Sequence, residues 1–123
     1  MSAIVNEVKL GIVGYRKFTD YIKFSEIVDE YIKEIGQPIL IVSGGAKGVD
    51  TMAEKYAKEH NIPTQIFYPD WEKYKKGAGL IRNTDIINAS THVLALPNIK
   101  SVGTLDSINK AKIMKKNLKV VDV

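Results

Sequence analysis

The chain contains no cysteine and only two histidines, His60 and His92. The absence of cysteine excludes disulfide bonds, thiol nucleophiles and cysteine-ligated metal sites. The two histidines stand apart, and no cluster of histidine and acidic residues has the spacing of metal ligands. Ser43 lies in Val-Ser-Gly-Gly instead of the Gly-x-Ser-x-Gly pattern of a hydrolase nucleophile. We therefore expect no bound metal and no serine or thiol hydrolase.

Long apolar runs are missing as well. No stretch approaches the about 20 apolar residues that a membrane-spanning helix needs, and the first residues do not join a basic region to an apolar run. From these absences we expect a cytoplasmic protein with no membrane partner. The 123 residues, 45% of them hydrophobic, suffice for one core, and no linker, repeat or low-complexity segment divides them. We therefore expect one domain over residues 1–123.

Acidic residues are fewer than basic ones. The chain has 18 lysines and arginines against 14 aspartates and glutamates, which gives a net charge of +4. The lysines gather in two stretches, at residues 73–76 and 110–119. This excess suits an anionic ligand, although lysine runs serve a solvated surface more often than a binding site.

Apolar β-type segments alternate with helical patterns along the chain, which is typical of consecutive βαβ units. We expect strands at residues 8–13, 39–42, 64–68, 92–96 and 119–123. We expect helices whose apolar faces cover residues 24–35 and 49–57, two more helices at 80–89 and 105–116, and an irregular segment at 69–79.

This alternation predicts an α/β fold, a Rossmann-like three-layer sandwich with a five-stranded parallel sheet. We expect the strand order 3-2-1-4-5, because a chain that winds outward from its first strand and then reverses places strands one and four side by side. Ligands bind in the crevice at such a reversal, outside the carboxyl ends of the strands. The loops that follow the first four strands should therefore meet at one edge of the sheet.

Those loops, together with the segment that follows the third strand, hold most of the glycine and polar residues that are candidates for a ligand-binding site. The candidate ligand-binding residues are Gly14, Tyr15, Arg16, Ser43, Gly44, Gly45, Ala46, Lys47, Gly48, Asp50, Asp70, Trp71, Arg82, Asn83, Gly103 and Thr104.

The segment 42–50, Val-Ser-Gly-Gly-Ala-Lys-Gly-Val-Asp, joins the second strand to the helix that follows it. Its glycines let a ligand approach the backbone, and the first N–H groups of a helix lack partners within the helix. Together they favour an anion such as phosphate, and a tight turn without a ligand is the alternative. The segment is no Walker loop, because Lys47 precedes Gly48, and the first strand lacks the dinucleotide fingerprint. We expect no cofactor.

The other candidates each have a structural interpretation beside the functional one. Arg16 offers a donor fork for phosphate, or pairs with a carboxylate such as Asp50. Lys47 neutralises a phosphate or points to solvent. Asp50 orients Arg16 or Lys47 or accepts hydrogen bonds from a ribose or base, or it only suits the first turn of a helix without any ligand. Trp71 stacks on a base or packs in a core or subunit interface. Thr104 belongs to a second anion site at a helix start, or only caps that helix.

Five motifs follow one another along the chain. They are Gly14-Tyr-Arg-Lys-Phe-Thr-Asp20, Ser43-Gly-Gly-Ala-Lys-Gly-Val-Asp50, Pro69-Asp-Trp71, Gly77-Ala-Gly-Leu-Ile-Arg-Asn83 and Gly103-Thr104. Together they resemble the YspA-like branch of the SLOG superfamily, which includes the DNA-processing protein DprA and the Lonely Guy enzymes. The resemblance covers nearly the whole chain.

The resemblance implies a Rossmann-like domain that binds a nucleotide or nucleotide-derived ligand through the Gly-Gly-Ala and Gly-Thr turns. Lonely Guy members hydrolyse nucleoside monophosphates with an arginine and with the glutamate of Pro-Gly-Gly-x-Gly-Thr-x-x-Glu. Here Lys100-Ser-Val102 replaces Pro-Gly-Gly, and Ser107 stands in place of the glutamate. Members often form homodimers, for which Trp71 and Tyr74 are interface candidates.

Three functions are compatible with these patterns. The first is a module, such as a sensor, that binds a nucleotide-like small molecule at the carboxyl edge of the sheet. The second is a nucleotide-processing hydrolase that uses Asp70 or Asp106 as its acid or base. The third is DNA or RNA binding through the lysine-rich C-terminal helix. We do not expect a nucleic-acid partner, because no nucleic-acid motif is present and a net charge of +4 is modest.

Overall fold

The computed structural model describes residues 7–123. The first six residues of the expected domain lie outside the described residues, and most of the N-terminal stretch that was tested for a targeting signal lies there too. The strands are β1 (Lys9–Gly14), β2 (Leu40–Ser43), β3 (Thr64–Ile66), β4 (His92–Leu96) and β5 (Asn117–Val120). They form one sheet in the order β3-β2-β1-β4-β5, and every neighbouring pair is parallel. The predicted strand order is confirmed.

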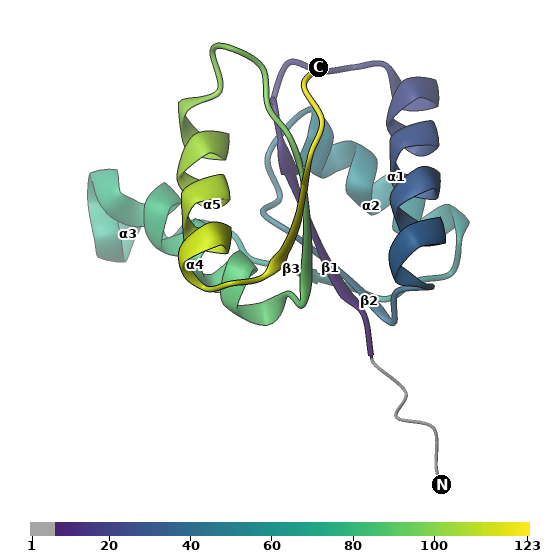
Figure 1. Ribbon diagram of the computed structural model, residues 1–123. Helices are drawn as coiled ribbons and strands as arrows, with labels where there is room; N and C mark the ends of the chain where they lie inside the picture. The colour runs from purple at the N-terminus through teal and green to yellow at the C-terminus, as the bar shows by residue number, and fades with distance from the viewer. Residues whose placement is uncertain (1–6) are drawn as a thin grey trace, which may run out of the picture.

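Helices cover both faces of the sheet (Figure 1). The helices α1 (Tyr21–Ile35) and α2 (Val49–Glu59) pack on one face. The helices α4 (Ala78–Ala89) and α5 (Val102–Ile113) pack on the other, and the short α3 (Trp71–Tyr74) and the 3-10 turn η1 (Lys75–Gly77) precede α4. The predicted three-layer α/β sandwich is confirmed.

The interior strand β4 shows why the sheet is buried on both sides. Its side chains alternate between the two faces: Leu94 and Leu96 pack with α1 and α2, whereas Val93 and Ala95 pack with α4 and α5. All four are fully buried. A parallel strand covered on both faces reads as a continuous apolar run rather than as an alternation. The two cores hold the sheet rigid and fix its loops at the carboxyl edge.

The helix α1 begins and ends where local chemistry dictates. The carboxylate of Asp20 accepts a hydrogen bond from the N–H of Lys23 at 3.0 Å and so caps the first turn. The helix ends before Gly36, whose φ of 95° is a conformation that favours glycine. The apolar face between these ends carries Phe24, Val28 and Tyr31, all buried.

The prediction of an irregular segment at residues 69–79 is wrong, because these residues contain α3, η1 and the start of α4. Asp70 caps α3 by accepting a hydrogen bond from the N–H of Lys73 at 3.0 Å. Two glycines, Gly77 and Gly79, suggested a loop, yet Gly79 lies inside α4 against the ring of Trp71. Capping and packing outweigh the intrinsic helix penalty of glycine here.

Other boundaries differ by a few residues for identifiable reasons. β3 ends at Ile66 because its only partner β2 ends at Ser43, the residue paired with Ile66. β5 begins at Asn117, opposite His92, so it is set by the register of β4. α5 begins at Val102 instead of residue 105, directly after Ser101, whose hydroxyl makes no capping bond and instead accepts from the N–H of Asn98 at 3.0 Å. Within residues 7–123, no helix combines the length and the apolar character needed to cross a membrane.

Candidate functional site

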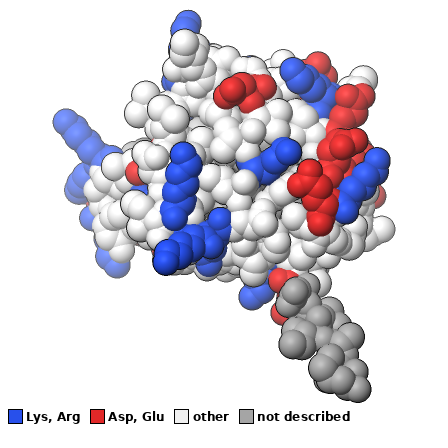
Figure 2. Space-filling view, in the orientation of Figure 1, with Lys and Arg blue, Asp and Glu red and all other residues white. Residues whose placement is uncertain are grey.

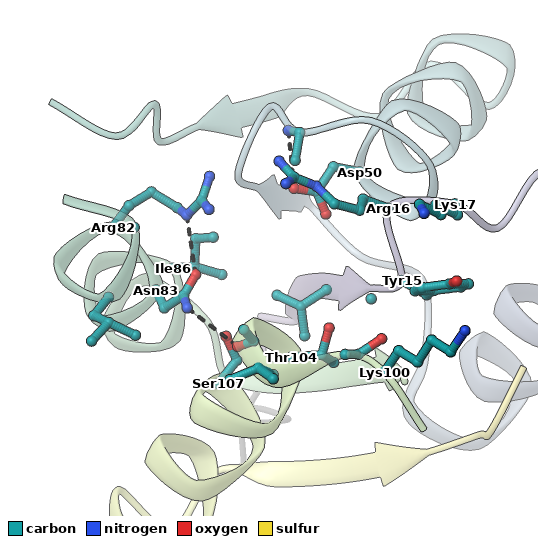
Figure 3. Close-up of a pocket in the computed structure, with 18 of the residues that line it drawn as sticks. Tyr15, Arg16, Lys17, Asp50, Arg82, Asn83, Ile86, Lys100, Thr104 and Ser107 are labelled. Atoms are coloured by element: carbon teal, nitrogen blue, oxygen red, sulfur yellow. Dashed lines mark hydrogen bonds between the residues drawn. The ribbon is translucent and has the colours of Figure 1, made fainter. Parts of the chain in front are cut away.

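Two adjoining cavities open at the carboxyl edge of the sheet. The first, of about 520 Å³, lies between the loop after β1, the start of α2, and the first turns of α4 and α5 (Figure 3). The second, of about 630 Å³, lies beside the glycine turn after β2. The residues that line both are Arg16, Lys17, Ala46, Trp71 and Arg82. The cavities are therefore two parts of one crevice, which runs from the junction of β1 and β4 to the ends of β2 and β3.

The crevice is strongly cationic. Its charged lining residues are Arg16, Lys17, Lys47, Lys76, Arg82, Lys100 and, as the only carboxylate, Asp50. Acidic side chains gather elsewhere, over α1 (Figure 2). Like charges collected in a concave site raise the local concentration of an oppositely charged ligand. The crevice is therefore suited to anions far better than the net charge of the chain suggests.

The glycine turn between β2 and α2 requires glycine at two positions. Gly48 has a φ of 71°, and a Cβ there would lie 2.4 Å from the carbonyl carbon and oxygen of Arg16. Gly45 has a φ of 69° and lies against the ring of Tyr68. The N–H of Val49 also donates to the carbonyl of Tyr15 at 3.3 Å. The turn is thus packed backbone against backbone on the loop after β1, which positions Arg16.

Replacement of Gly48 by alanine is expected to destabilise the protein by about 2–4 kcal/mol, because it adds left-handed strain to a backbone clash. Gly77→Ala is the matched control. Its φ is −83°, nothing lies within 4 Å of the added Cβ, and alanine there should be neutral or stabilising by up to about 1 kcal/mol. Urea denaturation of the two variants measures the difference. Equal stabilities would show that the turn is not packed as described.

Arg82 ties α4 to the glycine turn across the crevice. Its Nη1 donates to the carbonyl of Gly44 at 2.5 Å, and its Nε donates to Oδ1 of Asn83 at 3.0 Å. Burial lowers the pKa of Arg82; the carboxylate of Asp50 opposes this effect, and the charge of Arg16 adds to it. A guanidinium has five N–H donors, so part of the fork stays available to a ligand.

Asp50 lies in the first turn of α2 with only 7% of its surface exposed. Its Oδ2 accepts a hydrogen bond from the N–H of Ala46 at 3.1 Å. Burial raises the pKa of Asp50 to about 6, against the lowering effects of the Ala46 N–H and the charge of Arg82. Ionisation of this carboxyl at neutral pH therefore lowers the stability of the folded state.

The opposite wall of the crevice is the first turn of α5. Nδ2 of Asn83 donates to the carbonyl of Gly103 at 3.3 Å and to Oδ2 of Asp106 at 3.2 Å, which joins α4 to α5. Thr104 and Ser107 line the first cavity from α5 and are 7% and 1% exposed (Figure 3). This wall offers hydroxyl groups where the opposite wall offers charges.

The structure brings most of the predicted residues together. Those that line the first cavity are Gly14, Tyr15, Arg16, Ala46, Asp50, Trp71, Arg82, Asn83, Gly103 and Thr104. Those that line only the second are Gly44, Gly45 and Lys47. Gly103 and Thr104 lie inside the first turn of α5 rather than in a turn before it.

Four predicted residues line neither cavity. Gly48 supports the turn, and Ser43 is fully buried with a hydroxyl that has no hydrogen-bond partner in the described chain. Asp70 caps α3, and the carboxylate of Asp106 contacts Nζ of Lys110 at 2.8 Å. Neither of these carboxylates lines the crevice, so neither is placed to act as an acid or base on a ligand there.

Sequence reasoning missed several polar residues of the first cavity, namely Lys17, Lys76, Lys100, Ser101 and Ser107. Lys17, Lys100 and Ser101 belong to the loops after β1 and β4, so the rule that these loops meet at one edge would have found them. Lys76 lies in a segment that the sequence predicts to be irregular, so the sequence carries no comparable signal for it. Within residues 7–123, no group of three or more His, Cys, Asp or Glu side chains is arranged to hold a metal ion.

Two solved structures of DNA processing protein A (DprA) share this fold. The DprA of Streptococcus pneumoniae matches with a TM-score of 0.73 and 19% sequence identity, over 93% of this chain and 50% of that one. The DprA of Helicobacter pylori, studied for its single-stranded DNA binding mode, matches with a TM-score of 0.69 and 27% identity, over 92% of this chain and 64% of that one. The chain thus spans half to two thirds of these proteins.

The Helicobacter protein overturns one expectation. We did not expect a nucleic-acid partner, and this was wrong, because a structural relative with 27% identity binds single-stranded DNA. The expectation weighed a modest net charge over the whole chain. The structure instead collects cations at one edge of the sheet and acidic residues over α1, so the net charge is a poor guide to the crevice.

Sequence comparisons place the chain in a family. The Gene 61 protein of Mycobacterium phage D29 is 29% identical over 107 residues, which cover 82% of this chain and 86% of that protein. The family model described as "YspA, cpYpsA-related SLOG family" matches residues 8–74, more than half of the chain. The match contains β1, the glycine turn and Trp71, which build one side of the crevice. The chain therefore belongs to the YspA-related SLOG family.

Proposed function

We propose that this protein binds a nucleotide or a nucleotide-derived small molecule in the crevice at the carboxyl edge of its sheet. The observation that carries the proposal is the convergence of Arg16, Arg82 and four lysines from separate segments around a space of ligand size. Only one carboxylate opposes them. A phosphate group is the part of a nucleotide that such a lining attracts most strongly.

The phosphate would lie between the two arginines and the glycine turn. Arg82 is already oriented by Gly44 and Asn83, so little side-chain entropy is lost when it binds. The N–H groups of Gly45 and Lys47 have no acceptor within the described residues and line the second cavity. Free backbone N–H groups before a helix favour an anion.

The rest of the ligand would use the rim. Trp71 lines both cavities and is 59% exposed, although it is the largest apolar side chain of the chain. Leu80 and Val102, also exposed, line the first cavity on the neighbouring helices. An exposed tryptophan beside a phosphate site provides a face on which a base can stack.

Binding without turnover, as in a sensor, agrees best with the lining. Ser107 lines the first cavity where the Lonely Guy pattern has a glutamate, and Asp70 and Asp106 lie outside both cavities. Acid–base cleavage of a nucleotide needs a titratable group in reach of the scissile bond. Asp50 is the only carboxylate in the crevice, and it lies beside the proposed phosphate position.

Single-stranded DNA is a second candidate ligand for the same crevice. It is favoured by the single-stranded DNA binding of the Helicobacter relative and by two exposed aromatic side chains, Tyr68 and Trp71, beside the cations of the second cavity. Alternating aromatic and cationic groups are the usual composition of a surface that binds single strands.

Calorimetric titration distinguishes these ligands. We expect a mononucleotide, a dinucleotide such as NAD, or ADP-ribose to bind, with stabilisation of the protein in a parallel thermal melt. If the second candidate holds, a short single-stranded oligonucleotide binds more tightly than any of these, and its affinity falls steeply with salt. The absence of binding by every probe at low salt would contradict the proposal.

A further inference from the structure

Asp50 is the one feature of the crevice that an anion site does not explain. It is the only carboxylate among the lining residues, it is 7% exposed, and it lies among cations. A negative charge in this position repels a phosphate and weakens its binding. The carboxylate must therefore serve something other than the attraction of an anion.

The structural duty of Asp50 does not need a charge. Its hydrogen bond from the N–H of Ala46 to Oδ2 would form equally with the side-chain oxygen of asparagine. The N–H of Gly44 also favours the ionised form, but it lowers the pKa less than the N–H of Ala46 does. A carboxylate near a helix N-terminus gains a modest dipole interaction, but burial here outweighs it, since the pKa of Asp50 is raised. A neutral residue of the same shape would give the folded protein a higher stability.

The position of Asp50 relative to Arg82 indicates what the carboxylate meets. A single point beside Gly44, where a Cβ would stand, is 2.7 Å from Nη1 of Arg82 and 3.0 Å from Oδ2 of Asp50. Arg82 and Asp50 thus both pack closely against Gly44 and leave no room for a ligand atom at that point, and both residues line the first cavity beside it. A ligand whose phosphate is held by the arginines brings the group bonded to that phosphate next to Asp50, and in a nucleotide this group is the sugar.

We infer that Asp50 is the specificity-determining residue of the crevice, and that its carboxylate accepts hydrogen bonds from the ribose hydroxyls of a ribonucleotide-type ligand. The inference rests on the proposed function. An ionised carboxyl has roughly four acceptor positions, so capacity remains beside the N–H groups of Ala46 and Gly44 for two neighbouring hydroxyls. A deoxyribose, or an inorganic anion, leaves the buried charge without this compensation.

The test compares adenosine monophosphate with its deoxyribose analogue by calorimetry, in the wild-type protein and in Asp50→Asn. We expect the wild type to bind the ribonucleotide about 10-fold or more tightly, because hydrogen bonds to a charged group are the strong ones. Asp50→Asn should lose most of this preference. It should also bind inorganic pyrophosphate more tightly than the wild type does, since the repulsion is removed.

Glu54→Gln is the matched control, because Glu54 lies one turn further along α2 and outside both cavities, and this variant should keep the preference. Circular dichroism confirms that both variants fold. Equal affinity for the two nucleotides in the wild type, or an unchanged preference in Asp50→Asn, overturns the inference and leaves the proposed function standing. Failure of both nucleotides and of pyrophosphate to bind the wild type overturns the inference and counts against the proposed function as well.

Discussion

Replacement of Arg82 by alanine is expected to weaken nucleotide binding by about 100-fold or more, since it removes the guanidinium that in the proposed complex makes charge-assisted hydrogen bonds to the phosphate. It also removes the bond from Nη1 to the carbonyl of Gly44, so the glycine turn loses its tether to α4. Arg82→Lys should recover only part of the affinity, because an ammonium has no planar fork. Calorimetric titration with the tightest ligand found measures these changes.

Two further variants separate binding from folding. Arg16 is exposed, and within residues 7–123 its guanidinium makes no hydrogen bond or ion pair, so Arg16→Ala should weaken binding by about 10- to 100-fold and change stability by less than about 0.5 kcal/mol. Lys33→Ala removes a cation from the exposed face of α1 and should change neither quantity. An affinity that falls equally in Lys33→Ala would mean that only net charge matters.

The second large effect is on stability. Asp50→Asn is expected to stabilise the protein at about pH 8 by up to about 3 kcal/mol, because a rise in pKa from 3.8 to about 6 means that ionised Asp50 disfavours the folded state. The folded state binds the proton more tightly than the unfolded state does. The wild type therefore loses stability as the pH rises from about 4 through about 6, while the variant does not.

Urea denaturation at several pH values measures this difference. The gain should shrink as the pH falls and vanish below about pH 4, where Asp50 is protonated in both states. The charged groups that act on Asp50 are Arg82 on α4 and Glu54 on α2. Both are present in the wild type and in Asp50→Asn, so the comparison isolates the charge of Asp50 itself. Asp85→Asn, at an exposed position of α4, is the control and should show no such pH dependence. A destabilised Asp50→Asn at neutral pH would contradict the account of this carboxyl.

A residue that lowers stability while lining a ligand site is typical of a functional trade-off. If Asp50→Asn is more stable and has lost its preference for ribose, the two measurements together identify the function that the charge serves. Stability without a change of ligand preference would leave the charge without an explanation in this crevice.

Much of the fold could be predicted from local patterns. The alternation of apolar strands and amphipathic helices gave five parallel strands, and the reversal after the third strand gave the order β3-β2-β1-β4-β5. The bounds of β4 agree residue for residue with the run from His92 to Leu96, because that strand is apolar on both faces. Edge strands were less well placed, since β3 and β5 are limited by the registers of their single partners.

The site could be predicted only in part, for a physical reason. The glycine turn and Arg16 carry local signals: a strand end, glycine and a helix start. The role of Arg82 depends on contacts across the crevice, with its Nη1 on the carbonyl of Gly44, 38 residues away. The burial of Asp50 is likewise a tertiary property that no local pattern reveals. Lys76 lines the crevice because α3 and η1 position it there. These two elements could not be predicted, since the glycines of that segment indicated a loop.

The central claim is that a nucleotide binds at the carboxyl edge of the sheet, and amide NMR of the isotope-labelled protein during titration tests it most directly. We predict that the amide signals of Gly45, Ala46, Gly103 and Thr104 shift and saturate together, because they lie on opposite walls of one crevice. The amides of Thr91 and His92, at the other end of β4, should stay unchanged. Shifts confined to that opposite end, or to the surface of α1, would contradict the account.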